Sequence, residues 1–373
     1  MSGAWIVAAK RTAVAPRHGA LAALAVHDLA APLIQAILAE TGLAPDSVDD
    51  IILGNALYGG GNPARVAGLA AGLPLRVPAQ TIDTQCCAGL DAVIAASERI
   101  AAGAADVILC GGVESFSRSP LRLRRPLHDD EEAVEYQRPP FTPWADRDPD
   151  MIASAHDLAM RLGVSRGRQE AFAIESHRKA LAARDRLRRE IVTVGGLDHD
   201  AFARVLSEKT CARLLALAGT ITAATTAVEA DAAAVLVIVS DAALQRLNSV
   251  HAVRITASRR VAGDPVLPGQ MSTQAAQAVL AQSQLTAGDI AAVEIMEAFA
   301  VQALGTVEAL RFDPACVNRG GGALSRGHPI GASGAILAVR LFHELQQEKP
   351  GTRGLATIAA AGGLGSALIA EKV

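Results

Sequence analysis

Two segments, one in the first third of the chain and one close to its C-terminus, share one pattern, and this repetition limits the possible folds more than any other sequence feature. CCAGLDAVIAA at 86–96 and GASGAILAVRL at 331–341 both join a small-residue turn to a helical pattern, with Gly89 and Gly334 at equivalent places (334 − 89 = 245). Each is followed by an apolar strand pattern ending in paired glycines, at Gly111 and Gly362 (362 − 111 = 251). Matched units in the same order predict an internal duplication whose two α/β halves pack together. Chance similarity in a chain rich in Ala and Gly is the alternative.

Short apolar runs alternate with longer helical patterns along the rest of the chain. Strands are predicted at AWIVAAK, DDIILGNAL, ADVILCGG, AAAVLVIVSD, AVRITASRRVA and AAVEIMEAF, and helices at 26–41, 91–102 and about 332–347. This alternation is typical of an α/β fold with covered sheets. The apolar tract GLATIAAAGGLGSALIA is interrupted by glycines, so it predicts two buried strands joined by a tight turn and not a membrane helix.

A region of different character, 119–218, separates the halves. It begins with the polar, proline-broken RSPLRLRRPLHDDEEAVEYQRPPFTPW and continues into a charged helical pattern. We interpret it as an insertion on the surface of the α/β body, since loops of this length are often binding elements. The expected division is residues 1–118 plus about 219–245 for one half, 119–218 for the inserted loop domain, and 246–373 for the other half.

Composition excludes several classes of protein. Half of the 373 residues are apolar and a fifth are charged, which is typical of a globular soluble protein. The net charge is −3 and no basic block is long enough to follow a phosphate backbone, so we expect no nucleic-acid partner. The N-terminal MSGAWIVAAKRT lacks the order of a signal peptide, and five cysteines without regular spacing fit a reducing cytoplasm. We expect no association with a membrane.

The paired cysteines at 86 and 87 stand where the first duplicated helix begins. A thiol at a helix N-terminus is close to free backbone N–H groups, a setting that lowers its pKa and stabilises the thiolate. Cys86 or Cys87 is therefore a candidate nucleophile, whereas the other three cysteines are interpreted as small buried residues: Cys110, Cys211 and Cys316. A nucleophilic thiol needs a base, and His328 in GHP precedes the second duplicated helix. If a pseudo-twofold relates the halves, Cys86 and His328 meet.

Taken together, these motifs resemble the thiolase family, the acyl-CoA C-acyltransferases that make or cleave 3-ketoacyl-CoA. The resemblance covers nearly the whole chain and rests on motifs in the family's order: RTAVAPRHGALA, VDDIILGNALYGGGNPARVAGLAAGLP, CCAGLDAV, CGGVESFSRSP, MEAFAVQAL and GGGALSRGHPIGASGAIL. It implies the family's duplicated α/β/α/β/α layered fold, at least a homodimer and possibly a homotetramer or a complex with a partner subunit. It implies coenzyme A or acyl-CoA as substrate, with no permanently bound cofactor and no metal.

The resemblance also assigns roles to individual residues. Cys86 is expected to become acylated, and His328 to activate it and help to hold the thioester oxygen. The N–H groups of Cys86 and Ala361 form the oxyanion hole of the acyl-enzyme. Met151 and Phe299 line the acyl pocket, and the 119–218 insertion carries the coenzyme A.

Three positions depart from the family pattern. The family's second cysteine, which moves the proton of the incoming acetyl group, is replaced by Ala359. The asparagine of the family's NEAF box, which orients a water in the other oxyanion hole, is replaced by Met296. A serine that contacts the coenzyme A chain is replaced by Ala227.

These departures leave three functional interpretations. The first is an ordinary thiolase in which another group, such as Glu297, substitutes for the missing base. The second is an acyltransferase that loads Cys86 and passes the acyl group to an acceptor that is already activated. The third is a non-catalytic protein of the same fold that binds acyl-CoA or a partner subunit. Acylation of Cys86 separates the two enzymes from the binding protein.

Overall fold

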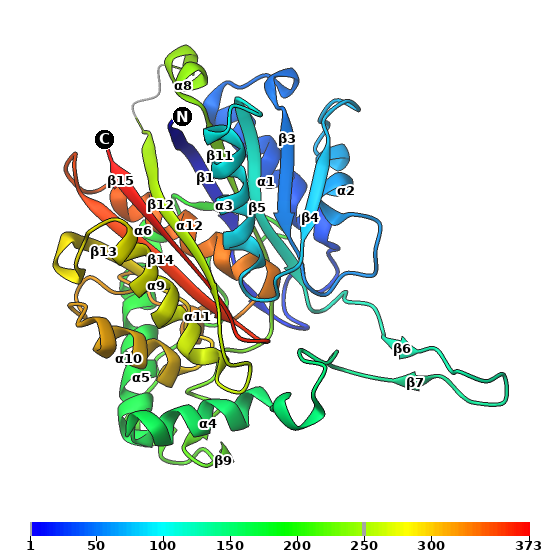
Figure 1. The fold of residues 1–373 in the computed structure, drawn as a ribbon, viewed down its shortest axis with the longest axis vertical. Helices are drawn as coiled ribbons and strands as arrows, with labels where there is room; N and C mark the ends of the chain where they lie inside the picture. The colour runs from blue at the N-terminus through cyan, green and yellow to red at the C-terminus, as the bar shows by residue number, and fades with distance from the viewer. Residues whose placement is uncertain (1, 248–250) are drawn as a thin grey trace.

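The computed structural model describes residues 2–247 and 251–373. Its main strands form one mixed sheet in the order β13–β14–β15–β12–β1–β11–β5–β3–β4 (Figure 1). The first half contributes β1 (Ala4–Thr12), β3 (Asp50–Gly54), β4 (Ala79–Ile82), β5 (Val107–Ser115) and β11 (Ala230–Val239), and the second half contributes β12 (Val253–Ala262), β13 (Ile290–Ile295), β14 (Arg353–Ala360) and β15 (Leu364–Lys372). The predicted strands are confirmed, and the C-terminal apolar tract is the predicted pair of buried strands.

Strand pairing confirms the internal duplication. In the first half β3 and β5 are parallel, while β5–β11 and β11–β1 are antiparallel. In the second half β13 and β14 are parallel, while β14–β15 and β15–β12 are antiparallel. The halves join where β1 pairs antiparallel with β12, with Ile6 opposite Val253.

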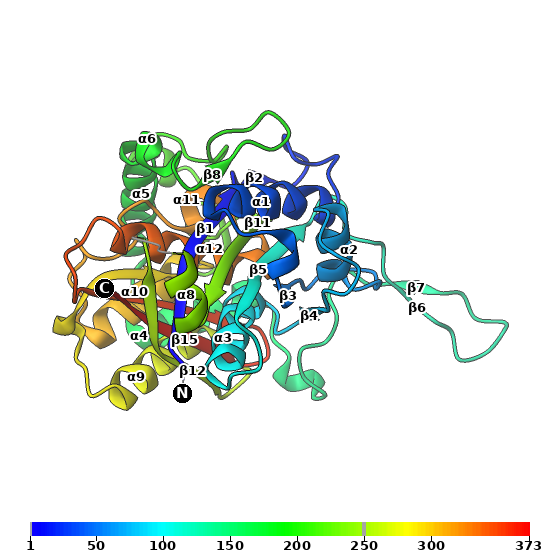
Figure 2. The ribbon, with the colours of Figure 1, turned by 90° about the horizontal axis from the view of Figure 1, so that it is seen from above.

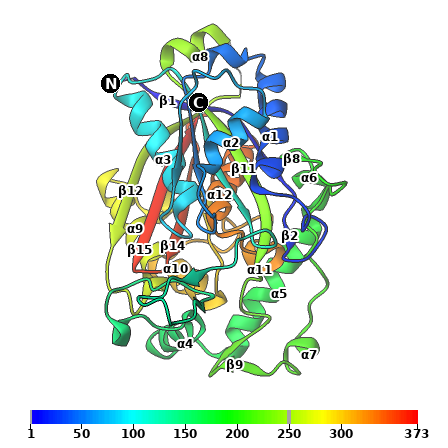
Figure 3. The same cartoon turned by 90° about the vertical axis from the view of Figure 1, so that its right-hand side faces the viewer.

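The duplicated helices lie at the centre of the molecule. α3 (Ala88–Ala101) and α12 (Ile330–Leu345) pack against each other between the two halves of the sheet (Figure 3). Gly89 and Gly334 mark the contact: a Cβ on Gly89 would lie 2.7 Å from the backbone N of Ala335, and one on Gly334 would lie 2.4 Å from the backbone N of Leu90. The repeated glycines therefore allow the first turns of both helices to approach one site.

Outer helices complete a layered α/β/α/β/α arrangement. α1 (Val26–Thr41) and α2 (Pro63–Ala70) cover the first half of the sheet, and α9 (Met271–Gln282) packs on the second half beside α10 (Ala300–Leu310). α12 is buried along almost its whole length, which explains why its sequence is mostly apolar and why its Arg340 is held in buried ion pairs. None of the helices within the described ranges is long and apolar enough to cross a membrane.

The 119–218 segment lies at one end of this body. Its elements are β6 (Leu123–Arg124), β7 (Val134–Glu135), α4 (Met151–Leu162), α5 (Arg166–Ala182), α6 (Arg184–Leu187), β8 (Ile191–Val192), α7 (Glu208–Cys211) and β9 (Ala216–Ala218). β6 and β7 form an arm that extends away from the body (Figures 1 and 2). Smaller elements elsewhere are β2 (Ala15–Pro16), β10 (Ile221–Thr222), α8 (Asp241–Leu247), α11 (Ala323–Arg326) and the 3₁₀ turns Pro45–Ser47, Ala145–Arg147, Pro268–Gln270 and Ala287–Asp289.

Buried ion pairs attach this segment to both halves. Arg11 of β1 pairs with Glu190 and Asp200, and Arg340 of α12 also pairs with Glu190. Arg11 and Arg340 are each at most 1% exposed. Removing one partner would leave a buried charge uncompensated, so these contacts hold the segment in one position against the body.

Candidate active site

One cavity of about 200 Å³ is lined by most of the residues that the sequence singled out, but not by Met296 or Glu297. It lies among the start of α3, the start of α10, α4 and the turn between β14 and β15. Seven of the predicted residues line it: Cys86, Met151, Ala227, Phe299, His328, Ala359 and Ala361. Other apolar residues, such as Leu158 and Val301, complete the wall.

 The predicted site residues other than Met296 therefore meet in a single, mostly apolar cavity.

The turn that carries Cys86 is held in a strained conformation. Gln85, immediately before it, has a φ of 55°, in the left-handed region that few non-glycine residues adopt. Asp91 of α3, which is 3% exposed, accepts hydrogen bonds from Thr84 Oγ1 (2.7 Å) and from Ser366 Oγ of β15 (2.6 Å). These bonds fix the turn to the second half of the sheet, so they offset the strain at Gln85 and set the direction of the thiol.

His328 lies at the equivalent position before α12. Its Nε2 is 3.2 Å from Cys86 Sγ, and its Nδ1 is 2.6 Å from Ser333 Oγ. The Ser333 hydroxyl donates its one proton to Pro329 O (3.0 Å), so its oxygen accepts a bond from Nδ1–H. The imidazole is therefore held in the tautomer whose Nε2 is unprotonated and can accept the proton of the thiol.

Burial sets the resting charge of this pair. It raises the pKa of Cys86 to about 12, although the N–H groups of Ala361 and of Cys86 itself act in the opposite direction. Burial also lowers the pKa of His328 to about 4. At neutral pH the pair is a thiol and a neutral imidazole. The sequence-based expectation of a resting thiolate is thus wrong, because the loss of hydration outweighs the helix N-terminus.

The turn between β14 and β15 brings backbone donors to the sulfur. Gly362 and Gly363, with φ values of 79° and 77°, turn the chain immediately after Ala361. The Ala361 N–H acts to lower the pKa of the Cys86 thiol, against the effect of burial. A donor in this place can also stabilise negative charge on an oxygen attached next to that sulfur.

Two positions that would carry polar groups in the family are apolar in the structure. Ala359 lines the cavity with its methyl group. Met296 is 1% exposed and belongs to the central apolar core. Cys86 and His328 are the only titratable side chains that line the cavity within the described residues.

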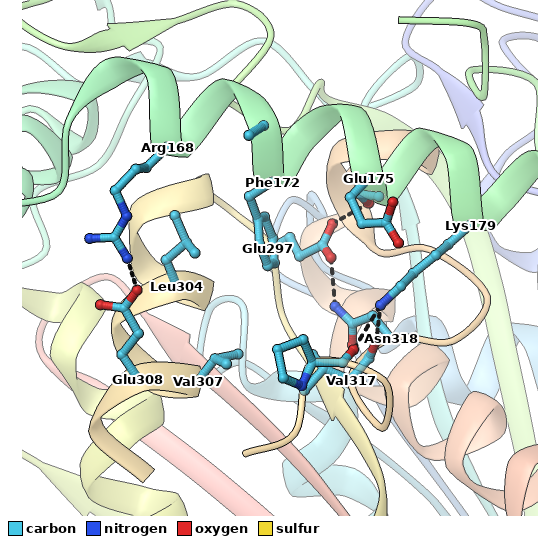
Figure 4. Close-up of a pocket in the computed structure, with 13 residues that line it drawn as sticks. Arg168, Phe172, Glu175, Lys179, Glu297, Leu304, Val307, Glu308, Val317 and Asn318 are labelled. Carbon is cyan, nitrogen blue, oxygen red and sulfur yellow. Dashed lines mark hydrogen bonds and ion pairs between the residues drawn. The ribbon is translucent and has the colours of Figure 1, made fainter. Parts of the chain in front are cut away.

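Glu297 does not face this cavity, so the suggestion that it replaces the missing base is wrong. It lines a separate pocket of about 390 Å³ between α5 and α10 (Figure 4). Its carboxylate accepts hydrogen bonds from Asn318 Nδ2 (2.6 Å), Ser176 Oγ (2.7 Å) and the N–H of Leu324 (3.2 Å). Burial raises its pKa, and its contacts tie α5 to the loop before α11.

Sequence reasoning missed three polar residues around the site, namely Ser333, Asp91 and Glu114. Glu114 is 1% exposed and accepts bonds from the N–H groups of Ala56 (3.0 Å) and Gly331 (2.9 Å), so it links the first half to the start of α12. Burial raises its pKa to about 7. In the sequence, each of these three residues is a polar residue within an otherwise apolar motif, and this was the signal that could have identified them. No cluster of His, Cys, Asp or Glu among the described residues is arranged to hold a metal ion.

A Cys–His pair before the N-termini of two duplicated, packed helices, inside an apolar cavity, is typical of a cysteine-dependent acyl-transfer enzyme. Comparison with known families agrees with this class. Residues 4–242 match the thiolase N-terminal domain and residues 250–372 match the thiolase C-terminal domain. The chain belongs to the thiolase family, and it is a thiolase-type acyl-CoA acyltransferase.

Individual relatives extend over the full chain. It is 37% identical to a putative acetyl-CoA C-acetyltransferase (YhfS) of Bacillus subtilis, over 98% of each chain. It is 36% identical to a putative acetyl-CoA C-acetyltransferase (VraB) of Staphylococcus aureus, over 99% of each. The Bacillus anthracis acetyl-CoA acetyltransferase structure superposes with a TM-score of 0.91 at 30% identity, covering 100% of this chain and 99% of that one. Human mitochondrial 3-ketoacyl-CoA thiolase in complex with CoA also gives 0.91, at 28% identity, with 100% and 98% covered.

Proposed function

We propose that the protein transfers an acyl group from acyl-CoA through a thioester on Cys86. His328 Nε2 takes the thiol proton as Sγ attacks the acyl carbon, and the carbon–sulfur bond to coenzyme A then breaks. The proton passes from His328 to the departing coenzyme A sulfur, so that a neutral pair becomes an acyl-enzyme and a free thiol. The N–H groups of Cys86 and Ala361 stabilise the oxyanion between these steps. The observation that carries the proposal is the 3.2 Å contact between Sγ and Nε2 inside an apolar cavity.

The second half of the reaction is proposed to use an acceptor that needs no further base from the protein. Thiolysis and Claisen condensation both move a proton at the carbon next to a thioester. Ala359 and Met296 supply no group for that step, and Glu297 is held in another pocket. His328 remains available to remove the proton of a thiol, hydroxyl or amine acceptor. Ordinary thiolase turnover is therefore expected to be slow.

Substrate binding is proposed to involve the 119–218 segment as a coenzyme A-carrying unit between the halves 1–118 plus about 219–245 and 246–373. Its helix α4 contributes Met151, Ser154 and Leu158 to the wall of the cavity, which supports an acyl chain lying between α4 and the nucleophile. Met151 and Phe299 would contact that chain. Ala227 lines the same cavity without a hydroxyl, so it can contact the thioester arm only through its methyl group.

Intact-mass analysis tests the acyl-enzyme. After incubation with acetyl-CoA we expect one acetyl adduct, absent in Cys86→Ala and retained in Cys87→Ala. Cys87 is a matched control because it is adjacent, fully buried with its sulfur 3.7 Å from Ile358 O, and does not line the cavity. An adduct on Cys87 alone would contradict the assignment of the nucleophile, and no adduct with any acyl-CoA would favour a non-catalytic binding protein.

We further propose a homodimer or homotetramer in the reducing cytoplasm, with a role in lipid metabolism. β4 is the last strand of the sheet and pairs only with β3 among the described residues, and it leads directly to Cys86. Its free edge, together with the small residues of α2, supports pairing with a second copy. The five cysteines are all unpaired. A monomer by light scattering at micromolar concentration would contradict the dimer.

A further inference from the structure

One polar side chain in the Cys86 cavity has no partner for its donor. Gln302 lies on α10 one turn after Phe299, so that both side chains point to the same face and line the cavity. Gln302 is 4% exposed, and its Nε2 makes no hydrogen bond within the part of the chain that the structure describes. A buried amide without a hydrogen-bond partner is energetically unfavourable. Its presence in an apolar wall therefore indicates that a bound ligand supplies the partner.

The other polar side chains of the lining are already engaged by the protein. Ser154 Oγ donates to Val266 O (2.7 Å) and Thr226 Oγ1 donates to Thr222 O (3.0 Å). Gln85 Nε2 donates to Asp83 Oδ1 (3.3 Å). Gln302 is thus distinguished from its neighbours by a donor that is available to a substrate.

Packing holds the Gln302 side chain against the cavity wall. A Cβ on Gly269 would lie 3.8 Å from Gln302 Cβ and Cγ and 2.8 Å from Leu158 Cδ2, so the stem of the glutamine has close neighbours on this side. Gln302, Leu158 and Gly269 also line a second hollow of about 210 Å³. The Gln302 side chain therefore belongs to the wall that the acyl cavity shares with this second hollow.

We infer that Gln302 is a specificity-determining residue that binds a neutral oxygen, a hydroxyl or carbonyl, on the acyl chain. A charged carboxylate is disfavoured because no Lys or Arg lines the cavity among the described residues. A saturated acyl group would cover the amide without bonding to it, whereas an oxygenated one would satisfy it. Sites with a buried polar group discriminate against analogues that lack the matching partner. The inference rests on the proposed acyl-enzyme.

Competition between acyl-CoA pairs of equal heavy-atom count tests this assignment. The pairs are 4-hydroxybutyryl-CoA against pentanoyl-CoA, and 3-hydroxybutyryl-CoA against 3-methylbutyryl-CoA. The readout is the ratio of kcat/KM values for acylation of Cys86, followed by intact mass. We expect the native enzyme to prefer the hydroxylated member of at least one pair by about tenfold, and Gln302→Met, which keeps an unbranched chain, to abolish that preference. Gln270→Met, in the neighbouring hollow only, is the matched control and should leave the ratio unchanged.

The outcomes separate the two proposals. If the native enzyme acylates but shows no preference in either pair, or if Gln302→Met keeps the preference, the assignment of Gln302 is wrong and the acyl-enzyme stands. If no acyl-CoA forms an adduct, the proposed function fails and the assignment fails with it. A merely structural glutamine would lower the Tm of Gln302→Met without changing the ratio, whereas loss of an unpartnered amide should leave the Tm unchanged or raise it.

Discussion

The resting charge of Cys86 gives the sharpest test of the site. The structure raises the pKa of this thiol, whereas a position at a helix N-terminus usually lowers a thiol pKa. Burial raises the thiol pKa from an ordinary 9.0 to about 12. With that pKa, roughly 0.1% of Cys86 is ionised at pH 9, compared with about half of a thiol at its ordinary pKa. We therefore expect no thiolate on Cys86 between about pH 6 and pH 9, and only about 1% near pH 10. Unfolding should restore the ordinary titration.

The measurement is the far-ultraviolet absorption of the thiolate across this pH range. The spectrum of Cys86→Ala is subtracted so that the other four cysteines cancel, and circular dichroism confirms that both proteins stay folded. The same titration in concentrated guanidinium gives the unfolded reference. A difference signal that is complete by about pH 8 would mean that Cys86 and His328 rest as a thiolate–imidazolium pair, and our account of the burial would be refuted.

Three further changes test the surrounding structure. Ser333→Ala removes the acceptor of His328 Nδ1–H, so acylation should slow by about tenfold or more with little change in KM. The control Ser325→Ala, whose hydroxyl bonds outside the cavity, should acylate normally. Equal acylation rates for Ser333→Ala and the native enzyme would show that the tautomer is set elsewhere. Ala359→Cys should raise the rate of acetoacetyl-CoA thiolysis by up to about 10²-fold, with the gain limited because Met296 still replaces the family's asparagine. A native enzyme that already turns over at tens per second would contradict the argument that the base is missing. Gly334→Ala should lower the free energy of unfolding by about 1–3 kcal/mol in urea melts, because its Cβ would meet the backbone of α3. The control Gly167→Ala, in open space on α5, should be neutral or stabilising. If Gly334→Ala were also neutral, the two helices would be able to move apart without cost.

Local patterns in the sequence determined the fold class and predicted the two residues that we propose react. Period and turn signals located α1, the starts of α3 and α12, and the main strands other than β4, because those elements are specified by neighbours in the chain. The repeated glycines predicted the duplication, and in the structure Cys86 and His328 each stand two residues before a duplicated helix. The structure then places their reacting atoms 3.2 Å apart.

Only the tertiary structure decided what surrounds this pair. Glu297 follows Met296 directly, yet its carboxylate is bound by Ser176 and Asn318 in another pocket, an arrangement that no local pattern specifies. The charge state of Cys86 depends on burial beneath residues far away in the chain, which outweighs the helix terminus that the sequence reveals. The free amide of Gln302 is likewise a property of packing: a sequence shows that a glutamine is present, but a hydrogen bond that is absent becomes visible only when all its neighbours are in place.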